Sequence, residues 1–146
     1  MKNTSMARSY IRQGLERIRH AEEALNNGNY PYVIRQSQEA VELLLKAALR
    51  LVGIEPPKWH DVGPILRREK LRFPNWFREH IPSLARISRR LRREREPAMY
   101  GDEELGIPPE EIYDKIDAEE ALEWARLVAD LVQKLYREYV SIAGEE

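Results

Sequence analysis

The segment YPYVIRQSQEAVELLLKAALRLVG, residues 30–53, carries the helical pattern that decides the fold. Small and apolar residues recur in it at steps of three and four, which is the spacing of one broad face of an α-helix. That face comprises Val33, Ser37, Ala40, Val41, Leu44, Ala48, Leu51 and Val52. Pro31 suits a first turn, where its missing N–H needs no partner, and Gly53 with the prolines after it forbids continuation. The segment is predicted to be a helix that packs along a wide stripe.

Residues 5–29, SMARSYIRQGLERIRHAEEALNNGN, precede it with a second helical pattern. Ser5 is predicted to be the N-cap, and Gly28 suits the left-handed position just after the helix. The predicted inner face comprises Met6, Tyr10, Gly14, Ile18, Ala21 and Leu25. Two adjacent helices with a short turn between them are expected to pack antiparallel.

The middle of the chain is interrupted by prolines. A short helix capped by Asp61 is expected in residues 60–70. Residues 73–96 are expected to hold another short helix and then a longer one from about Pro82. Residues 98–111, AMYGDEELGIPPEE, are predicted to be a loop because they contain two glycines and two prolines. Tryptophans are expected as core or interface anchors, namely Trp59, Trp76 and Trp124.

The last segment, from about residue 117 onward, has a stripe of apolar residues that is typical of a helix packed against a partner helix. Asp117 is predicted to be its N-cap, with Glu120 at the capping-box position. Steps of three and four connect Ala118, Ala121, Ala125, Val128, Val132, Leu135 and Tyr139. No segment alternates apolar and polar residues as a strand does. We therefore predict an all-α fold: a single domain over residues 1–146, built as an antiparallel up-and-down bundle of four main helices plus one or two short ones.

Length and composition narrow the class of protein. The chain has 146 residues and no cysteine, which excludes disulfides, thiolate zinc sites and cysteine nucleophiles and fits a cytoplasmic protein. No run approaches the roughly 18 apolar residues of a membrane span. Residues 1–101 hold 20 Lys and Arg against 11 Asp and Glu, whereas residues 102–146 hold 4 against 14. This asymmetry either steers a polyanion to one face or draws the two parts together.

Six arginines lie between residues 86 and 95. On a helix, Arg86, Arg89, Arg90 and Arg93 share one face. Their mutual repulsion has to be offset by solvent, by the acidic last helix or by phosphate, whose oxygens match the guanidinium fork. A charge-balanced surface, a polyanion contact and a catalytic site all remain open at this point.

Signatures of common enzymes and metal sites are missing from the sequence. It contains no GxxxxGK phosphate loop, no GxGxxG and no HExxH. His20, His60 and His80 lack ligand spacing, so we expect neither a metal nor a cofactor.

Residues 9–66 resemble the HEPN domain. The features are a first helix with paired alanines, a Gly-Asn-Tyr turn, the run QSQEAVELLLKAAL and a histidine before a short amphipathic segment. The likeness continues more loosely through LARISRRLRREREPAMYGDEE, residues 84–104, and the final helix. It implies a bundle of four or five helices that usually pairs as a two-fold homodimer.

The resemblance also implies a range of functions. Many HEPN proteins are metal-independent RNases with an arginine, four to six residues and then a histidine near the end of the third long helix. The histidine moves the 2′-hydroxyl proton and the arginine stabilises charge on phosphorus. Small prokaryotic members are often paired with a minimal nucleotidyltransferase as toxin and antitoxin. In some of these pairs the partner adds nucleotides to a tyrosine just past the motif.

This chain departs from the RNase motif. No arginine lies five to seven residues before any of its histidines; Arg95, then EPAM, then Tyr100 stands in place of the motif. The unperturbed phenol pKa, about 10, makes tyrosine a poor general base at neutral pH. Arg95 and Tyr100 are the candidate catalytic residues. The candidate nucleotide- or RNA-binding residues are Arg89, Arg92, Arg93 and Asp102.

Several roles remain open for this pair. Arg95 and Tyr100 form a binding cleft, or Tyr100 accepts a nucleotidyl group, or the loop docks a partner while Arg95 pairs with Asp102. A tyrosine that merely pins the loop to the bundle is the structural alternative. The leading functional hypothesis is a nucleotide- or RNA-binding regulatory component acting with a minimal nucleotidyltransferase. The alternatives are a metal-independent RNase with an altered Arg-x4-Tyr motif and a purely structural helical dimer.

Overall fold

The computed structural model describes residues 4–58 and 61–143, and within these ranges the regular elements are all helices. One isolated antiparallel bridge, Asp102 with Ile107, stands outside them. The predicted all-α class is confirmed. Two residues singled out from the sequence, Trp59 and His60, lie outside the described residues. In the part that the structure describes, no helix combines the length and apolarity needed to cross a membrane.

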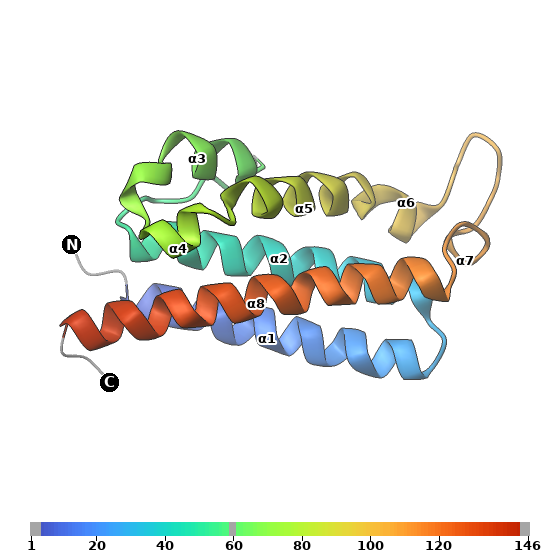
Figure 1. Cartoon of the computed structure of the whole chain (residues 1–146). Coiled ribbons are helices and arrows are strands. Elements are labelled where there is room, and N and C mark those ends of the chain that lie inside the picture. The colour runs from blue at the N-terminus through green and yellow to red at the C-terminus, as the bar shows by residue number, and fades with distance from the viewer. Residues whose placement is uncertain (1–3, 59–60, 144–146) are drawn as a thin grey trace.

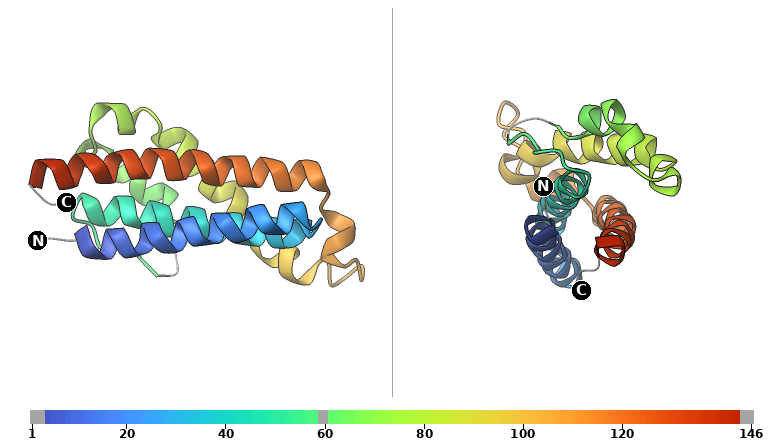
Figure 2. Two further views of the ribbon diagram at one scale, coloured as in Figure 1. Left: turned by 90° about the horizontal axis from the view of Figure 1, so that it is seen from below. Right: turned by 90° about the vertical axis from the view of Figure 1, so that its left-hand side faces the viewer.

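Four long helices form the bundle, and successive ones run in opposite directions (Figure 1). They are α1 (Thr4–Asn26), α2 (Tyr30–Leu51), α5 (Ile81–Arg93) and α8 (Lys115–Ala143). The end-on view in Figure 2 shows α1, α2 and α8 grouped together, with α5 on the far side of α2 from α1. The expected up-and-down arrangement is therefore present.

Short helices cover the two ends of α5. At its start lie α3 (Gly63–Arg68), η1 (Lys70–Arg72) and α4 (Asn75–Arg78), and at its end lie α6 (Arg95–Tyr100) and α7 (Pro109–Ile112). Phe73 and Phe77 stack with their ring centroids 4.8 Å apart and are almost fully buried. Trp76 and Trp124 are half-buried against the core, in agreement with their expected role as anchors.

The central helix of the molecule is α2, which contacts α1, α5, α6 and α8. Its predicted stripe is buried from Val33 to Ala48, while Leu51 and Val52 are half-buried. Contacts on several sides also bury Ile34, Leu45 and Leu49, which lie outside the stripe. Because α2 is apolar on several faces, it lies at the centre of the molecule, where neighbouring helices cover those faces.

The helices α1 and α2 approach closely at Gly14. A Cβ atom on Gly14 would lie 2.8 Å from Cγ of Leu44, so a larger residue would collide with α2. The predicted inner face of α1 was wrong at its start: Met6 is 42% exposed, whereas Ala7 and Ile11 are buried. Met6 and Ala7 differ by about 100° around the helix, so a shift of one residue in the buried face exposes the methionine and buries the alanine.

Both predicted glycine stops are confirmed. Gly28 has φ +74° and Gly53 has φ +84°. The N–H of Asn29 donates to Ala24 O at 2.9 Å, and the N–H of Ile54 donates to Leu49 O at 2.9 Å. These are the backbone bonds of Schellman motifs, which satisfy carbonyls left unpaired at a helix C-terminus.

Two predicted N-caps were wrong. Ser5 lies inside α1, which already includes Thr4. The N-cap of α8 is Asp114 rather than Asp117: the N–H of Asp117 donates to Asp114 Oδ1 at 3.0 Å, and the N–H of Asp114 donates to Asp117 Oδ2 at 3.1 Å. This is a reciprocal capping box, with Asp117 at the position assigned from sequence to Glu120.

We expect Asp114→Ala to lower the free energy of unfolding by about 1 kcal/mol, because α8 loses its N-terminal acceptor. Asp114→Asn keeps an acceptor and should change it by much less. Urea unfolding of the two variants measures the difference. Equal losses would mean that the carboxylate acts through its charge and not as a cap.

The predicted loop at residues 98–111 was wrong at both of its ends. Ala98 to Tyr100 complete α6, and Pro109 to Ile112 form α7. Pro97 and Pro109 occupy first turns, where the missing N–H has no helical partner to lose. Between the two helices, Gly101 turns the chain with φ +73° and ψ −155°.

Candidate functional site

The arginine run ends at a corner between α5 and α6. Glu94 separates the two helices, and its backbone N–H still donates to Leu91 O at 3.0 Å. Leu91 and Ala98, 2% and 3% exposed, fix the two helices to the core on either side of this break. The intervening arginines are therefore held at the surface by a rigid apolar base.

A shallow, open depression of about 630 Å³, here called the arginine hollow, lies along this corner. It is lined by Arg92, Arg93, Arg95, Glu96, Pro97, Met99 and Tyr100. Four of the six predicted site residues thus come together. Arg89, exposed on α5, and Asp102, half-buried in the turn after α6, lie outside the hollow. Tyr100 is 58% exposed, so it does not pin the loop to the bundle.

A pair between Arg95 and Asp102, one of the roles left open by the sequence, is not among the ion pairs of the described residues. Asp102 Oδ1 accepts the backbone N–H of Leu105 at 3.1 Å, and its backbone pairs in both directions with Ile107. Asp102 therefore shapes the turn after Gly101. Arg95 instead approaches Glu42, a residue of α2 that lies more than fifty positions earlier in the chain.

Glu42 is the residue of this region that sequence reasoning missed. Nε2 of Gln38 and Nζ of Lys46 donate to it at 2.9 and 3.0 Å. Nη1 of Arg92 lies 3.9 Å from Glu42 Oε1, and Nη1 of Arg95 lies 3.8 Å from it. A polar ladder at steps of four, Gln38, Glu42 and Lys46, on an otherwise apolar helix was the available signal.

Three cations surround Glu42. The carboxylate lies within ion-pair distance of Lys46, Arg92 and Arg95. Burial raises the pKa of Glu42, but the hydrogen bonds from Gln38 and Lys46 and the charges of Lys46 and Arg95 outweigh it, so the pKa lies below the usual 4.5. The carboxylate is therefore ionised at neutral pH beside both arginines.

The pKa shift of Glu42 predicts a pH dependence of stability. A carboxyl whose pKa is lower in the folded state stabilises that state fully above its unfolded pKa, 4.5 here, and loses the contribution as pH falls through the folded value. Glu42→Gln should therefore lower the free energy of unfolding by about 1 to 2 kcal/mol at pH 7. The difference from wild type should shrink steadily below pH 4.5. Chemical unfolding at several pH values measures it, and a constant difference would contradict the assignment.

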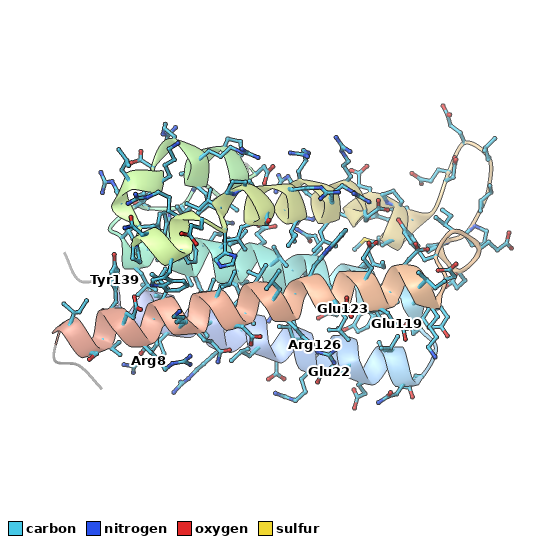
Figure 3. The ribbon with its side chains drawn as sticks, viewed as in Figure 1. Arg8, Glu22, Glu119, Glu123, Arg126 and Tyr139 are labelled. Atoms are coloured by element: carbon cyan, nitrogen blue, oxygen red, sulfur yellow. The ribbon has the colours of Figure 1, made fainter. Side chains whose placement is uncertain are left out.

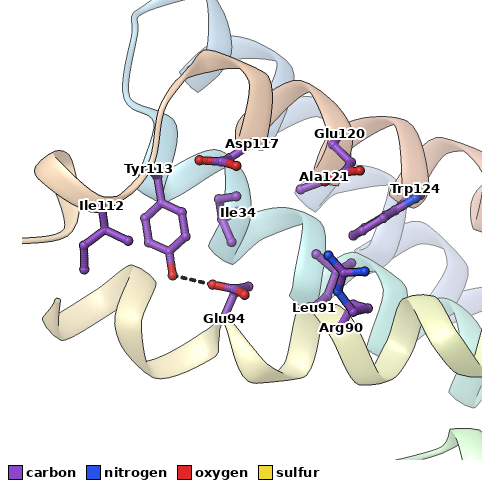
Figure 4. Close-up of a pocket in the computed structure, with 10 residues that line it drawn as sticks. All are labelled: Ile34, Arg90, Leu91, Glu94, Ile112, Tyr113, Asp117, Glu120, Ala121 and Trp124. Atoms are coloured by element: carbon purple, nitrogen blue, oxygen red, sulfur yellow. Dashed lines mark hydrogen bonds between the residues drawn. The ribbon is translucent and has the colours of Figure 1, made fainter. Parts of the chain in front are cut away.

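A second depression, the acidic hollow, lies between α5, α7 and α8 and measures about 260 Å³ (Figure 4). The Tyr113 hydroxyl donates to Glu94 Oε1 at 2.6 Å across it. Burial, then the hydrogen bond and charge of Glu94, raise the pKa of Tyr113 far above its ordinary value, so the phenol stays a donor. Arg90 lies over the Trp124 ring, 5.5 Å from its centroid.

The other face of α8 is tied to α1 by charged side chains (Figure 3). Nη2 of Arg126 lies 2.8 Å from Glu22, and Nε of Arg8 donates to the Tyr136 hydroxyl at 2.8 Å. The acidic last helix therefore has contacts with α1, while a carboxylate of α2, Glu42, lies beside Arg92 and Arg95. Glu119 and Glu123 on α8 are exposed.

Comparison with known proteins agrees with this architecture. The structure is similar to the crystal structure of TT1696 from Thermus thermophilus, with a TM-score of 0.69 over 88% of this chain and 96% of that one, at 25% sequence identity. No curated protein matches the sequence. The sequence model of the HEPN domain matches residues 7–135, which run from the start of α1 to the last turns of α8. The chain therefore belongs to the HEPN domain family.

Proposed function

We propose that this HEPN protein binds RNA or a nucleotide in the arginine hollow and acts as the regulatory partner of a minimal nucleotidyltransferase. The observation that carries the proposal is the convergence of Arg92, Arg93 and Arg95 beside the exposed Tyr100. Guanidinium groups match phosphate oxygens in geometry and charge, and an exposed phenol ring offers a stacking surface for a base.

The long contacts between Glu42 and the arginines support the same role. Its distances of 3.9 and 3.8 Å to the Arg92 and Arg95 nitrogens are longer than charge-assisted hydrogen bonds, which measure roughly 2.7–2.9 Å. A phosphate group can therefore approach Arg95 without breaking a tight ion pair. Glu42 would then stay beside the Arg95 guanidinium while the phosphate binds it.

The hollow is open on one side, and we propose that a second copy of the chain completes it around a two-fold axis. Such an interface would bring the same patch of both protomers together, including Arg95 from each. Exposed Met99 and Tyr100 provide apolar surface beside the arginines. Light scattering coupled to gel filtration would reveal the dimer mass, and a monomer at all concentrations would exclude this arrangement.

We also propose that Tyr100 accepts a nucleotidyl group from the partner, which its 58% exposure supports. Its phenol oxygen would attack the α-phosphorus of a nucleoside triphosphate, pyrophosphate would leave, and the phenolic proton would pass to solvent or to the partner. The product is a phosphodiester on tyrosine. The arginines would then hold the new negative charge at the protein surface.

Binding to a single-stranded RNA oligonucleotide tests the first part of the proposal. We expect Arg93→Ala/Arg95→Ala to weaken binding at least about tenfold. The double variant should also show a weaker salt dependence, because a complex with fewer phosphate contacts releases fewer counterions when it forms. Arg12→Ala, an exposed arginine on α1, is the control and should change little. Salt-independent binding, or equal losses in both variants, would contradict the hollow as the site.

Co-expression with the neighbouring nucleotidyltransferase gene tests the second part. Intact-mass measurement should show additions of whole nucleotides, and Tyr100→Phe should abolish them. Tyr32→Phe, a half-buried tyrosine on α2, should leave the additions unchanged. Additions that persist in Tyr100→Phe would place the acceptor elsewhere.

One observation favours an RNase as the second candidate: Arg95 and Tyr100 line the same hollow. Incubation of the protein with mixed RNA in EDTA decides this alternative. Cleavage that disappears in both Arg95→Ala and Tyr100→Phe would establish it. If RNA is neither bound nor cleaved, the helical dimer is left with a structural role.

A further inference from the structure

The acidic hollow has a different chemistry from the arginine hollow. Carboxylates reach it from two sides: Glu94 from the α5–α6 corner, and Asp117 and Glu120 from α8 (Figure 4). Among the described residues that line it, Arg90 is the single cation. Since Arg90 lies over the Trp124 ring and has no carboxylate within ion-pair distance among the described residues, it does not neutralise the three acids.

The floor and walls of the acidic hollow are apolar. Ile34 lies between Glu94 and Asp117 in Figure 4, and Leu91 and Ala121 are buried beneath the opening. The Trp124 ring closes the end beside Arg90. An occupant therefore meets hydrocarbon and aromatic surface inside and negative charge around the rim.

The spacing of the three carboxylates favours an organic cation over a metal ion as the ligand. No three His, Asp or Glu side chains come close enough to hold a metal ion in residues 4–58 and 61–143. Instead, the carboxylates surround a cavity of about 260 Å³. This volume is slightly below that of the smallest typical small-ligand pockets, roughly 300 Å³. That arrangement suits a ligand with an apolar body and an ammonium group at its edge.

We propose that the acidic hollow binds a small organic amine, with its apolar body over Ile34 and Leu91 and its ammonium group between Glu94 and Glu120. The Tyr113 hydroxyl already donates to Glu94 Oε1 and so fixes the orientation of that carboxylate. The inference does not depend on RNA or nucleotide binding in the arginine hollow.

Nuclear magnetic resonance titration of the whole chain with benzylamine tests the proposal. The indole N–H resonance of Trp124, assigned by its loss in Trp124→Phe, should shift and saturate with a dissociation constant on the order of 1 mM, as expected for a ligand of this size. Benzyl alcohol has the same ring without the charge and should bind at least about tenfold more weakly, because it cannot pair with the carboxylates.

A matched pair of double variants tests the carboxylates. Glu94→Gln/Glu120→Gln should weaken benzylamine binding about tenfold, while the amide oxygen introduced by Glu94→Gln can still accept the Tyr113 hydroxyl. Glu119→Gln/Glu123→Gln removes the same charge from exposed positions on α8 outside the hollow and should bind like wild type. The absence of a saturable shift in wild type, equal binding of benzyl alcohol, or equal weakening in both double variants would overturn the proposal.

Discussion

Gly101→Ala should lower the free energy of unfolding by about 3 to 5 kcal/mol, the range reached when backbone strain and steric overlap combine. Gly101 has φ +73° and ψ −155°, a region that residues with a side chain avoid. A Cβ atom there would also overlap the carbonyl oxygen of Ile107 and lie 3.0 Å from Cα of Pro108. Both neighbours are backbone atoms, so no rotamer change relieves the contact.

Gly106 provides the matched control for this prediction. It also has a positive φ, +69°, but a Cβ atom there would have no heavy atom within 4 Å. Gly106→Ala should therefore cost only about 1 to 2 kcal/mol, the usual penalty of the left-handed region. Urea unfolding of both variants measures the difference. Similar losses would mean that the overlap at Gly101 is relieved by movement of the turn.

Leu44→Ala should cost about 2 to 5 kcal/mol, because it leaves a cavity in the centre of the bundle. Leu44 is fully buried, and its Cγ lies 2.8 Å from where a Cβ on Gly14 would be. Few atoms of α1 can move into the space, since the opposing residue has no side chain. Leu127→Ala is the control, because Leu127 is 42% exposed and its truncation should cost much less.

A double-mutant cycle makes this prediction sharper. Gly14→Ala alone gains up to about 1 kcal/mol of helix propensity but collides with Leu44. In Leu44→Ala/Gly14→Ala the new methyl group occupies vacated space, so the double variant should be more stable than Leu44→Ala by about 1 kcal/mol or more. Additive effects would mean that α1 and α2 already separate in the single variants.

The parts of the fold that local chemistry determines were predictable from the sequence. Gly28 and Gly53 were predicted as stops because a left-handed backbone after a helix favours glycine, and both adopt it. The apolar stripes of α2 and α8 were predicted because helical period alone places their residues on one face. The start of α8 was misplaced because Asp114 and Asp117 both suit an N-cap, and only the backbone geometry selects between them.

Features that depend on contacts between residues far apart in the sequence could not be predicted from local patterns. The short helices α6 and α7 are too short to be stable alone and are held by packing against the bundle. A pair between Arg95 and the nearby Asp102 was one of the roles left open by the sequence, yet the observed neighbour of Arg95 is Glu42, on a helix folded back beside it. Four predicted site residues nevertheless line one hollow, because consecutive turns of α5 and α6 present them on one side.

Glu94, the residue between α5 and α6, lines the acidic hollow, and the next residue, Arg95, lines the arginine hollow. One peptide bond therefore connects the two hollows. Glu94 faces Tyr113 on one side of the corner, and Arg95 faces Glu42 on the other. An amine that paired with the Glu94 carboxylate would act on the residue bonded to Arg95, and any resulting shift of the Arg95 guanidinium would change phosphate binding. By thermodynamic linkage, phosphate affinity and amine affinity would then change by the same factor, which would make the corner a point of heterotropic regulation.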